Sequence, residues 1–119
     1  MSNQILLVDD DLDLLEAFKE SLEIREYAVT TATNGLEAVE NYNKSSPCIV
    51  FIDIKMPLMD GYEAFSKIKE KHKDTKIVFV TGHEDADKTK TAFQAGLLKI
   101  LNKPILNKDV LDIIKENNC

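Results

Sequence analysis

The stretch CIVFIDIKMPLMDG, residues 48–61, indicates the fold of this chain. Its first five residues are apolar in succession, as expected of a strand that helices cover on both faces. Asp53 ends this apolar run, Met56-Pro57 stops the strand, and Asp60 begins a segment of helical periodicity. A carboxylate at the end of a buried strand is costly without a partner, so Asp53 is expected to meet charged groups from other strand ends.

Outward from this stretch, apolar runs alternate with helical periodicity along the whole chain. The pattern predicts strands at 4–8, 27–33, 48–53, 76–82 and 98–101, and helices at 12–23, 36–44, 61–71, 85–96 and 107–118. Parallel strands need crossover connections, so this alternation predicts a doubly wound parallel sheet with helices on both faces. We expect a single α/β domain of five βα units over residues 1–119, with no linker or repeat.

Local signals support the helices. Asn34 with Glu37, and Asp60 with Glu63, have the spacing of capping boxes. The apolar positions expected to face the core are Leu15, Phe18 and Leu22; Leu36, Val39 and Tyr42; Tyr62, Phe65 and Ile68; and Val110 and Ile114.

Charge and hydropathy exclude some functions. The net charge of −6 argues against direct nucleic-acid binding by this chain, which would need a basic patch. The N-terminus lacks the basic and apolar regions of a signal peptide, and no apolar segment approaches the length of a membrane span. We therefore expect no membrane partner.

The two cysteines, Cys48 and Cys119, have no metal-ligand spacing and suggest neither a zinc site nor a disulfide framework. Cys48 opens an apolar run and is expected to be a small buried hydrophobic residue. Cys119 is expected to be an exposed thiol. This usage predicts a reducing, cytoplasmic location.

Polar residues gather at the ends of the predicted strands. In a parallel sheet these ends share one edge, where ligands bind. The residues there are Asp9, Asp10 and Asp11 after the first strand, Asp53 after the third, Thr81 after the fourth, and Lys103 after the fifth. Crowded carboxylates favour a hard divalent cation, Mg²⁺ or alternatively Mn²⁺, and this set suits phosphoryl transfer to an aspartate nucleophile.

The motifs LLVDDD, NGLEAVE, DIKMPLMDG, VFVTG, AFQAG and NKP occur in this order and cover essentially the whole chain. In them the chain resembles the receiver domain of two-component response regulators, the CheY-like superfamily. The resemblance implies a flavodoxin-like strand order 2-1-3-4-5. It also implies a phosphorylation switch rather than an enzyme.

The resemblance assigns roles to residues. Asp53 is the implied phosphoacceptor, Asp10 a direct Mg²⁺ ligand, and Asp9 a ligand acting mainly through water. The backbone carbonyl of Lys55 would complete the protein's share of the coordination.

The resemblance also implies how the switch works. Lys103 would pair with the phosphoryl group and the Thr81 hydroxyl would be drawn toward it, and the Lys103-Pro104 bond is a candidate for the cis form. The implied partners are a sensor histidine kinase or phosphotransfer protein, and a downstream effector or output domain. The effector would bind the face formed by the fourth helix, the fifth strand and the fifth helix.

The chain departs from the family pattern on that face. Ile100 stands three positions before the lysine, where the family often has an aromatic residue, and Leu97 and Lys99 replace a small residue and an acid. Lys55 and His83 lie two positions after Asp53 and Thr81, and in the family the side chains at these positions flank the phosphate and tune its lifetime. Our hypothesis is that Lys55 holds a phosphoryl oxygen and slows attack by water.

Other interpretations stay open. Asp11 fits the N-cap of the first helix, and His83 fits an ordinary loop histidine. A phosphatase of the haloacid dehalogenase type would need a second acid at the position of Lys55, and a flavodoxin-type flavin site would be repelled by Asp9-Asp10-Asp11. A pseudo-receiver that only binds partners is a further alternative. The chain could be a stand-alone protein or a domain of a longer one.

Overall fold

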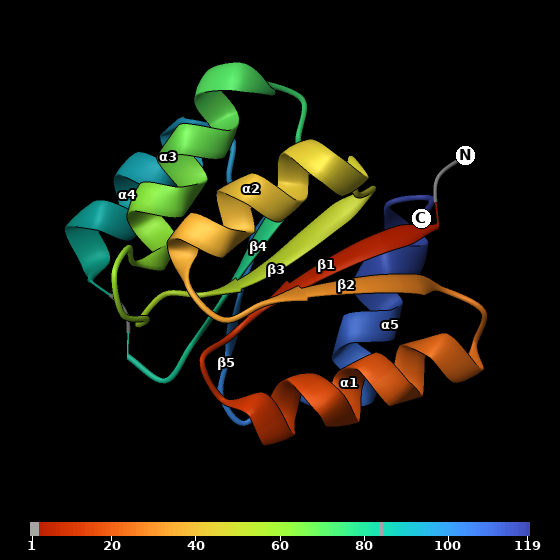
Figure 1. The fold of residues 1–119 in the computed structure, drawn as a ribbon. Coiled ribbons are helices and arrows are strands. Elements are labelled where there is room, and N and C mark those ends of the chain that lie inside the picture. Colours follow the sequence, from red (N-terminus) through yellow and green to blue (C-terminus); the bar gives the residue numbers. More distant parts are fainter. Residues whose placement is uncertain (1–2, 84) are drawn as a thin grey trace.

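The computed structural model describes residues 3–83 and 85–119. Figure 1 shows a central sheet between two layers of helices. The elements are β1 Gln4–Val8, α1 Leu12–Ile24, β2 Ala28–Ala32, α2 Gly35–Ser45, β3 Ile49–Asp53, α3 Gly61–Lys71, β4 Ile77–Thr81, α4 Ala86–Gln94, β5 Lys99–Asn102 and α5 Asn107–Glu116. The strands are all parallel in the order β2-β1-β3-β4-β5. The predicted fold and strand order are confirmed.

The central strand β3 divides its side chains between two apolar layers. Val50 and Ile52 pack with residues of α2, α3 and α4, whereas Ile49 and Phe51 pack with residues of α1 and α5. Every residue of β3, including Asp53, is buried. This alternation explains the unbroken apolar run, because both faces of the strand are covered by helices (Figure 1).

Side-chain caps begin four of the five helices. Asp11, Asn34, Asp60 and Asp85 each accept a hydrogen bond from the backbone N–H three residues later. The predicted N-cap role of Asp11 is confirmed. Glu37 completes its box differently from the prediction, because its carboxylate accepts hydrogen bonds from the N–H and hydroxyl of Thr33 rather than from Asn34. These hydrogen bonds lower the pKa of Glu37.

One predicted core position is wrong. Leu36 is 49% exposed, whereas Gly35, Ala38 and Tyr42 are buried on α2. The helix begins at Gly35, whose N–H donates to the Met59 carbonyl at 3.0 Å and whose Cα leaves no room for a Cβ beside Met59. This contact makes position 35 the start of the inward stripe, and a helix turn of about 100° per residue then rotates Leu36 outward.

The cysteine prediction is also wrong. Cys48 and Cys119 form a disulfide, with their Cα atoms 5.8 Å apart and 71 positions between them in sequence. Cys48 precedes β3, and Cys119 follows α5, which runs back to the edge of the sheet where β3 begins (Figure 1). The crossovers create this proximity, so spacing alone could not show it. The cysteines therefore give no support to a reducing, cytoplasmic location, which stays a prediction.

No helix within residues 3–83 and 85–119 has the length and apolar character needed to cross a membrane.

We predict that replacing both cysteines by serine lowers the free energy of unfolding by about 2–4 kcal/mol, because the crosslink restricts the unfolded chain. Urea unfolding with and without a reductant measures this difference. Reductant should destabilise the native chain and leave the double serine variant unchanged. Two titratable thiols in the unreduced, denatured chain would contradict the assignment.

Candidate functional site

Four strand ends meet at the carboxyl edge of the sheet. Parallel pairing places Val8 beside Ile52, Asp53 beside Val80, and Thr81 beside Asn102. The residues that end these strands, and those that directly follow them, therefore lie side by side along the carboxyl edge of the sheet. The structure brings Asp9, Asp10, Asp53, Thr81 and Lys103 to this edge, as the sequence predicted.

Three carboxylates form a compact cluster there. One oxygen each from Asp9, Asp10 and Asp53 lie within 4.8 Å of one another. Asp9 and Asp53 are only 2% and 5% exposed, whereas Asp10 is exposed. The cluster therefore has a buried floor and an open side toward solvent.

Lys103 bridges the two buried acids. Its Nζ lies 3.1 Å from Asp9 Oδ2 and 3.2 Å from Asp53 Oδ2. The other oxygen of each acid accepts a backbone N–H: Asp11 donates to Asp9 at 2.9 Å, and Lys55 donates to Asp53 at 3.3 Å. The two carboxylates thus share the Lys103 ammonium group, and each is also held by its own backbone amide.

The electrostatics of the cluster are unbalanced. Burial raises the pKa of the Asp53 carboxyl, and the charge of Asp9 raises it further, while Lys103 and the Lys55 amide oppose this shift. Burial lowers the pKa of Lys103, but its hydrogen bonds to Asp9 and Asp53 and their charges outweigh burial, so the pKa is raised. Among the described residues, Lys103 is the one cation paired with this cluster of three carboxylates, and the site favours additional positive charge.

The cluster fits the cation that the sequence predicted. All three side chains offer hard oxygen ligands, and Mg²⁺ binds through one or two carboxylates with waters and phosphate oxygens. Asp10 faces the open side, where a hydrated ion can enter. Lys55, whose carbonyl the resemblance assigned as a further ligand, lies in the loop directly after Asp53.

Thr81 lies at the end of β4 with only 1% of its surface exposed. Its hydroxyl accepts the N–H of His83 at 2.9 Å, which leaves the hydroxyl proton free to be donated. The N–H of Lys103 donates to the Thr81 carbonyl at 2.8 Å, and the Lys103-Pro104 bond is cis, as predicted. The loops after β4 and β5 are therefore joined at this point.

Lys55 and His83 are exposed and line an open pocket beside the acid cluster, together with Met56, Asp60 and Tyr62. The sequence assigned Tyr62 to the core. Its ring is half-buried and packs against the core, in agreement with the prediction, and its hydroxyl reaches Asp85. No sequence signal reveals this contact, because it joins two crossovers.

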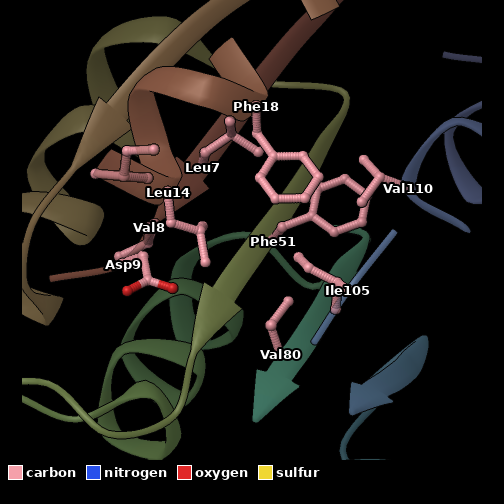
Figure 2. A pocket seen from close by; sticks show the side chains of 10 residues that line it. Leu7, Val8, Asp9, Leu14, Phe18, Phe51, Val80, Ile105 and Val110 are labelled. Carbon is pink, nitrogen blue, oxygen red and sulfur yellow. The ribbon is translucent and has the colours of Figure 1, made fainter. Parts of the chain in front are cut away.

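A second, apolar pocket lies on the other side of Asp9, between α1 and the sheet (Figure 2). Its walls include Leu14, Phe18, Phe51 and Ile105. Asp9 is the only polar residue in its lining, so this pocket does not extend the site.

Ile100 lies half-buried in β5, paired with Phe79 of β4, and packs against the layer of α2, α3 and α4.

Comparisons with known proteins agree with this geometry. Residues 5–115 match the model of the response regulator receiver domain. The chain is 38% identical over 116 residues to the chemotaxis protein CheY of Halobacterium salinarum, covering 98% of this chain and 97% of that protein. Several other relatives are longer transcriptional regulatory proteins, of which this chain spans about a quarter to a half.

Solved structures give the same result. The CheY-like receiver domain protein of Methanospirillum hungatei superposes with a TM-score of 0.91 at 30% identity, over 98% of this chain and 93% of the other. A CheX-CheY-BeF3-Mg²⁺ complex from Borrelia burgdorferi superposes with a TM-score of 0.85 at 26% identity, over 95% and 87% of the two chains.

We predict that Asp53→Asn stabilises the metal-free protein at pH 7. The raised pKa means that the folded state binds the Asp53 proton more tightly than the unfolded state does. The stability that this group contributes is therefore full below its unfolded pKa of about 4, and is lost as the pH rises through the folded pKa.

Urea unfolding in EDTA tests this prediction. The variant should gain more than about 0.5 kcal/mol at pH 7, beyond the usual effect of a surface substitution, and the gain should shrink toward pH 4. Lys103 keeps Asp9 as a partner in the variant. An unchanged or lower stability at pH 7 would show that the ionised Asp53 is not a burden to the fold.

Proposed function

The chain belongs to the family of response regulator receiver domains, and on this premise we propose that it is a switch whose phosphoacceptor is Asp53. The observation that supports the proposal best is the buried Asp53 carboxylate held by Lys103 beside Asp9 and Asp10. The donor would be the phosphohistidine of a sensor kinase or phosphotransfer protein. The family is one of signalling domains rather than enzymes.

In the proposed reaction, one Asp53 oxygen attacks the phosphorus of the phosphohistidine. A P–O bond forms, the P–N bond breaks, and the imidazole leaves and takes up a proton. Lys103 would pair with the new phosphoryl oxygens, and Thr81 would donate its unused hydroxyl proton to one of them. These two residues are already joined through the Lys103 N–H and the Thr81 carbonyl.

Asp9, Asp10 and Asp53, with the Lys55 carbonyl, would hold Mg²⁺, which supplies the positive charge that crowded carboxylates and a phosphoryl group require. The Borrelia CheY complex contains Mg²⁺ together with BeF3, which supports this assignment. Mn²⁺ has similar ligand preferences.

The output follows from the same contacts. A phosphoryl group on Asp53 would draw Thr81 and Lys103 toward it and shift the loops after β4 and β5. These loops lead into α4 and α5, so the α4-β5-α5 face would change its affinity for an effector or output domain. This chain would act in the cytoplasm, without contacting nucleic acid or membrane itself.

Two alternatives fit less well. A phosphatase of the haloacid dehalogenase type needs an acid at the position of Lys55, which is an exposed cation here. A pseudo-receiver would have no need for a buried acid pair bridged by a lysine, which costs stability.

We predict that Mg²⁺ and acetyl phosphate place one phosphoryl group on the native chain, seen by intact mass and removed by base or hydroxylamine. EDTA should prevent the reaction. Asp53→Asn should not react. The absence of an adduct on the native chain, or the same adduct on the variant, would contradict the proposal.

We also predict that Lys55→Ala increases the rate of dephosphorylation by about three- to tenfold, because one charged contact to a phosphoryl oxygen is lost. Lys71→Ala, another exposed lysine outside the site, is the matched control and should leave the rate unchanged. The decay of adduct after removal of acetyl phosphate measures both. Equal rates in native chain and Lys55→Ala would exclude this role.

A further inference from the structure

Tyr62 joins α3 to the segment that follows β4. It is the second residue of α3, and its ring packs edge-to-face against Phe79, with ring centroids 5.3 Å apart. Its hydroxyl extends past this contact. It accepts the N–H of Asp85 at 3.0 Å and can donate to the Asp85 carbonyl at 3.3 Å. Both backbone groups of the N-cap residue of α4 are thereby held by one side chain.

A third bond extends this contact into α4. The Tyr62 hydroxyl lies 3.1 Å from the Thr89 hydroxyl, and Thr89 is buried on the inner side of α4. The ammonium of Lys88 lies 5.6 Å from the centre of the Tyr62 ring. The first turn of α4 is therefore fixed to α3 through this tyrosine.

Two described points between β4 and α4 are consequently held, one at the end of β4 and one at the N-cap of α4. At the first, Thr81 accepts the N–H of His83. At the second, Tyr62 holds Asp85. Thr81 is also the residue whose hydroxyl a phosphoryl group on Asp53 would attract. A movement of Thr81 that also displaces Asp85 would lengthen or break the Tyr62 contacts.

Ile100 stands where the family often has an aromatic residue, so another side chain must sense movement on this face of the sheet if any does. Ile100 has no polar group, and it lies in the same apolar layer as Tyr62. The other two tyrosines are placed elsewhere: Tyr27 lies on the opposite face of the sheet, and Tyr42 bonds Thr75. Of the three tyrosines, Tyr62 is therefore the one whose hydrogen bonds would change if Asp85 moved.

We propose that Tyr62 is a positioning residue that holds Asp85 and the first turn of α4 in their unphosphorylated arrangement, and that this hold is released when Asp53 is phosphorylated or binds a phosphoryl analogue. The proposal rests on the function proposed above. By stabilising one of two states, the Tyr62 hydroxyl reduces the apparent affinity of the site for a phosphoryl group. It acts through Asp85 and the first turn of α4, without touching the reacting atoms.

The test uses trifluoroberyllate with Mg²⁺ as the phosphoryl probe. Tyr62→Phe removes the hydroxyl and retains the ring against Phe79. We expect the variant to bind the probe about three- to tenfold more tightly than the native chain, the factor expected from loss of a hydrogen bond in one state alone. Its free energy of unfolding without the probe should be lower. A merely structural role would not give opposite changes in affinity and stability.

Tyr42→Phe is the matched control. Tyr42 also pairs its hydroxyl with a threonine hydroxyl, at 2.8 Å from Thr75. This pair lies where β4 begins, away from the acid cluster. The control should lose stability and keep the native affinity for the probe. Thr89→Val is a second test of the contact and should shift the affinity in the same direction as Tyr62→Phe.

Amide exchange of Asp85 follows the contact directly. In the native chain this amide should be protected without the probe and exchange faster when trifluoroberyllate and Mg²⁺ are bound. Unchanged affinity in Tyr62→Phe, or equal protection of Asp85 in both states, would overturn the role of Tyr62 while the native chain still binds the probe. Failure of the native chain to bind the probe would instead contradict the proposed function, and the role of Tyr62 with it.

Discussion

The organisation of this site depends on one ammonium group between two buried carboxylates. Lys103 reaches Asp9 and Asp53 at almost the same distance, 3.1 and 3.2 Å, and its own backbone is tied to Thr81. One positive charge does not balance three acids, so the protein carries an electrostatic cost at the carboxyl edge of its sheet. That cost favours the binding of a cation at this edge. The same imbalance of charge therefore favours a bound cation and raises the free energy of the metal-free site.

Much of this arrangement follows from the sequence because it depends on local periodicity. The apolar run before Asp53 and the regular alternation of strands and helices are enough to place the acids at one edge of a parallel sheet. The cap at Asp11 follows equally from its position before a helix. Such features can be predicted from residues close together in sequence and from the rule that parallel strands are joined by crossover helices.

Features that depend on contacts between crossovers could not be predicted in this way. Leu36 has the spacing of a core residue, but the packing of Gly35 on Met59 sets a different inner face. Cys48 and Cys119 meet only because α5 returns to the start of β3. Tyr62 was correctly given an apolar environment, yet the partners of its hydroxyl lie in another βα unit. In each case the decisive neighbour is far along the chain.

The disulfide has a topological consequence as well. It closes residues 48–119 into a covalent ring that contains β3, β4 and β5 with their helices, and so Asp53, the proposed phosphoacceptor, and the bridging Lys103. The first two βα units lie outside it. A protease that cuts one peptide bond in α4 would open the ring without releasing a fragment. A nicked molecule of this kind would keep its acid cluster and α5 on one covalent framework until a reductant separates the two fragments.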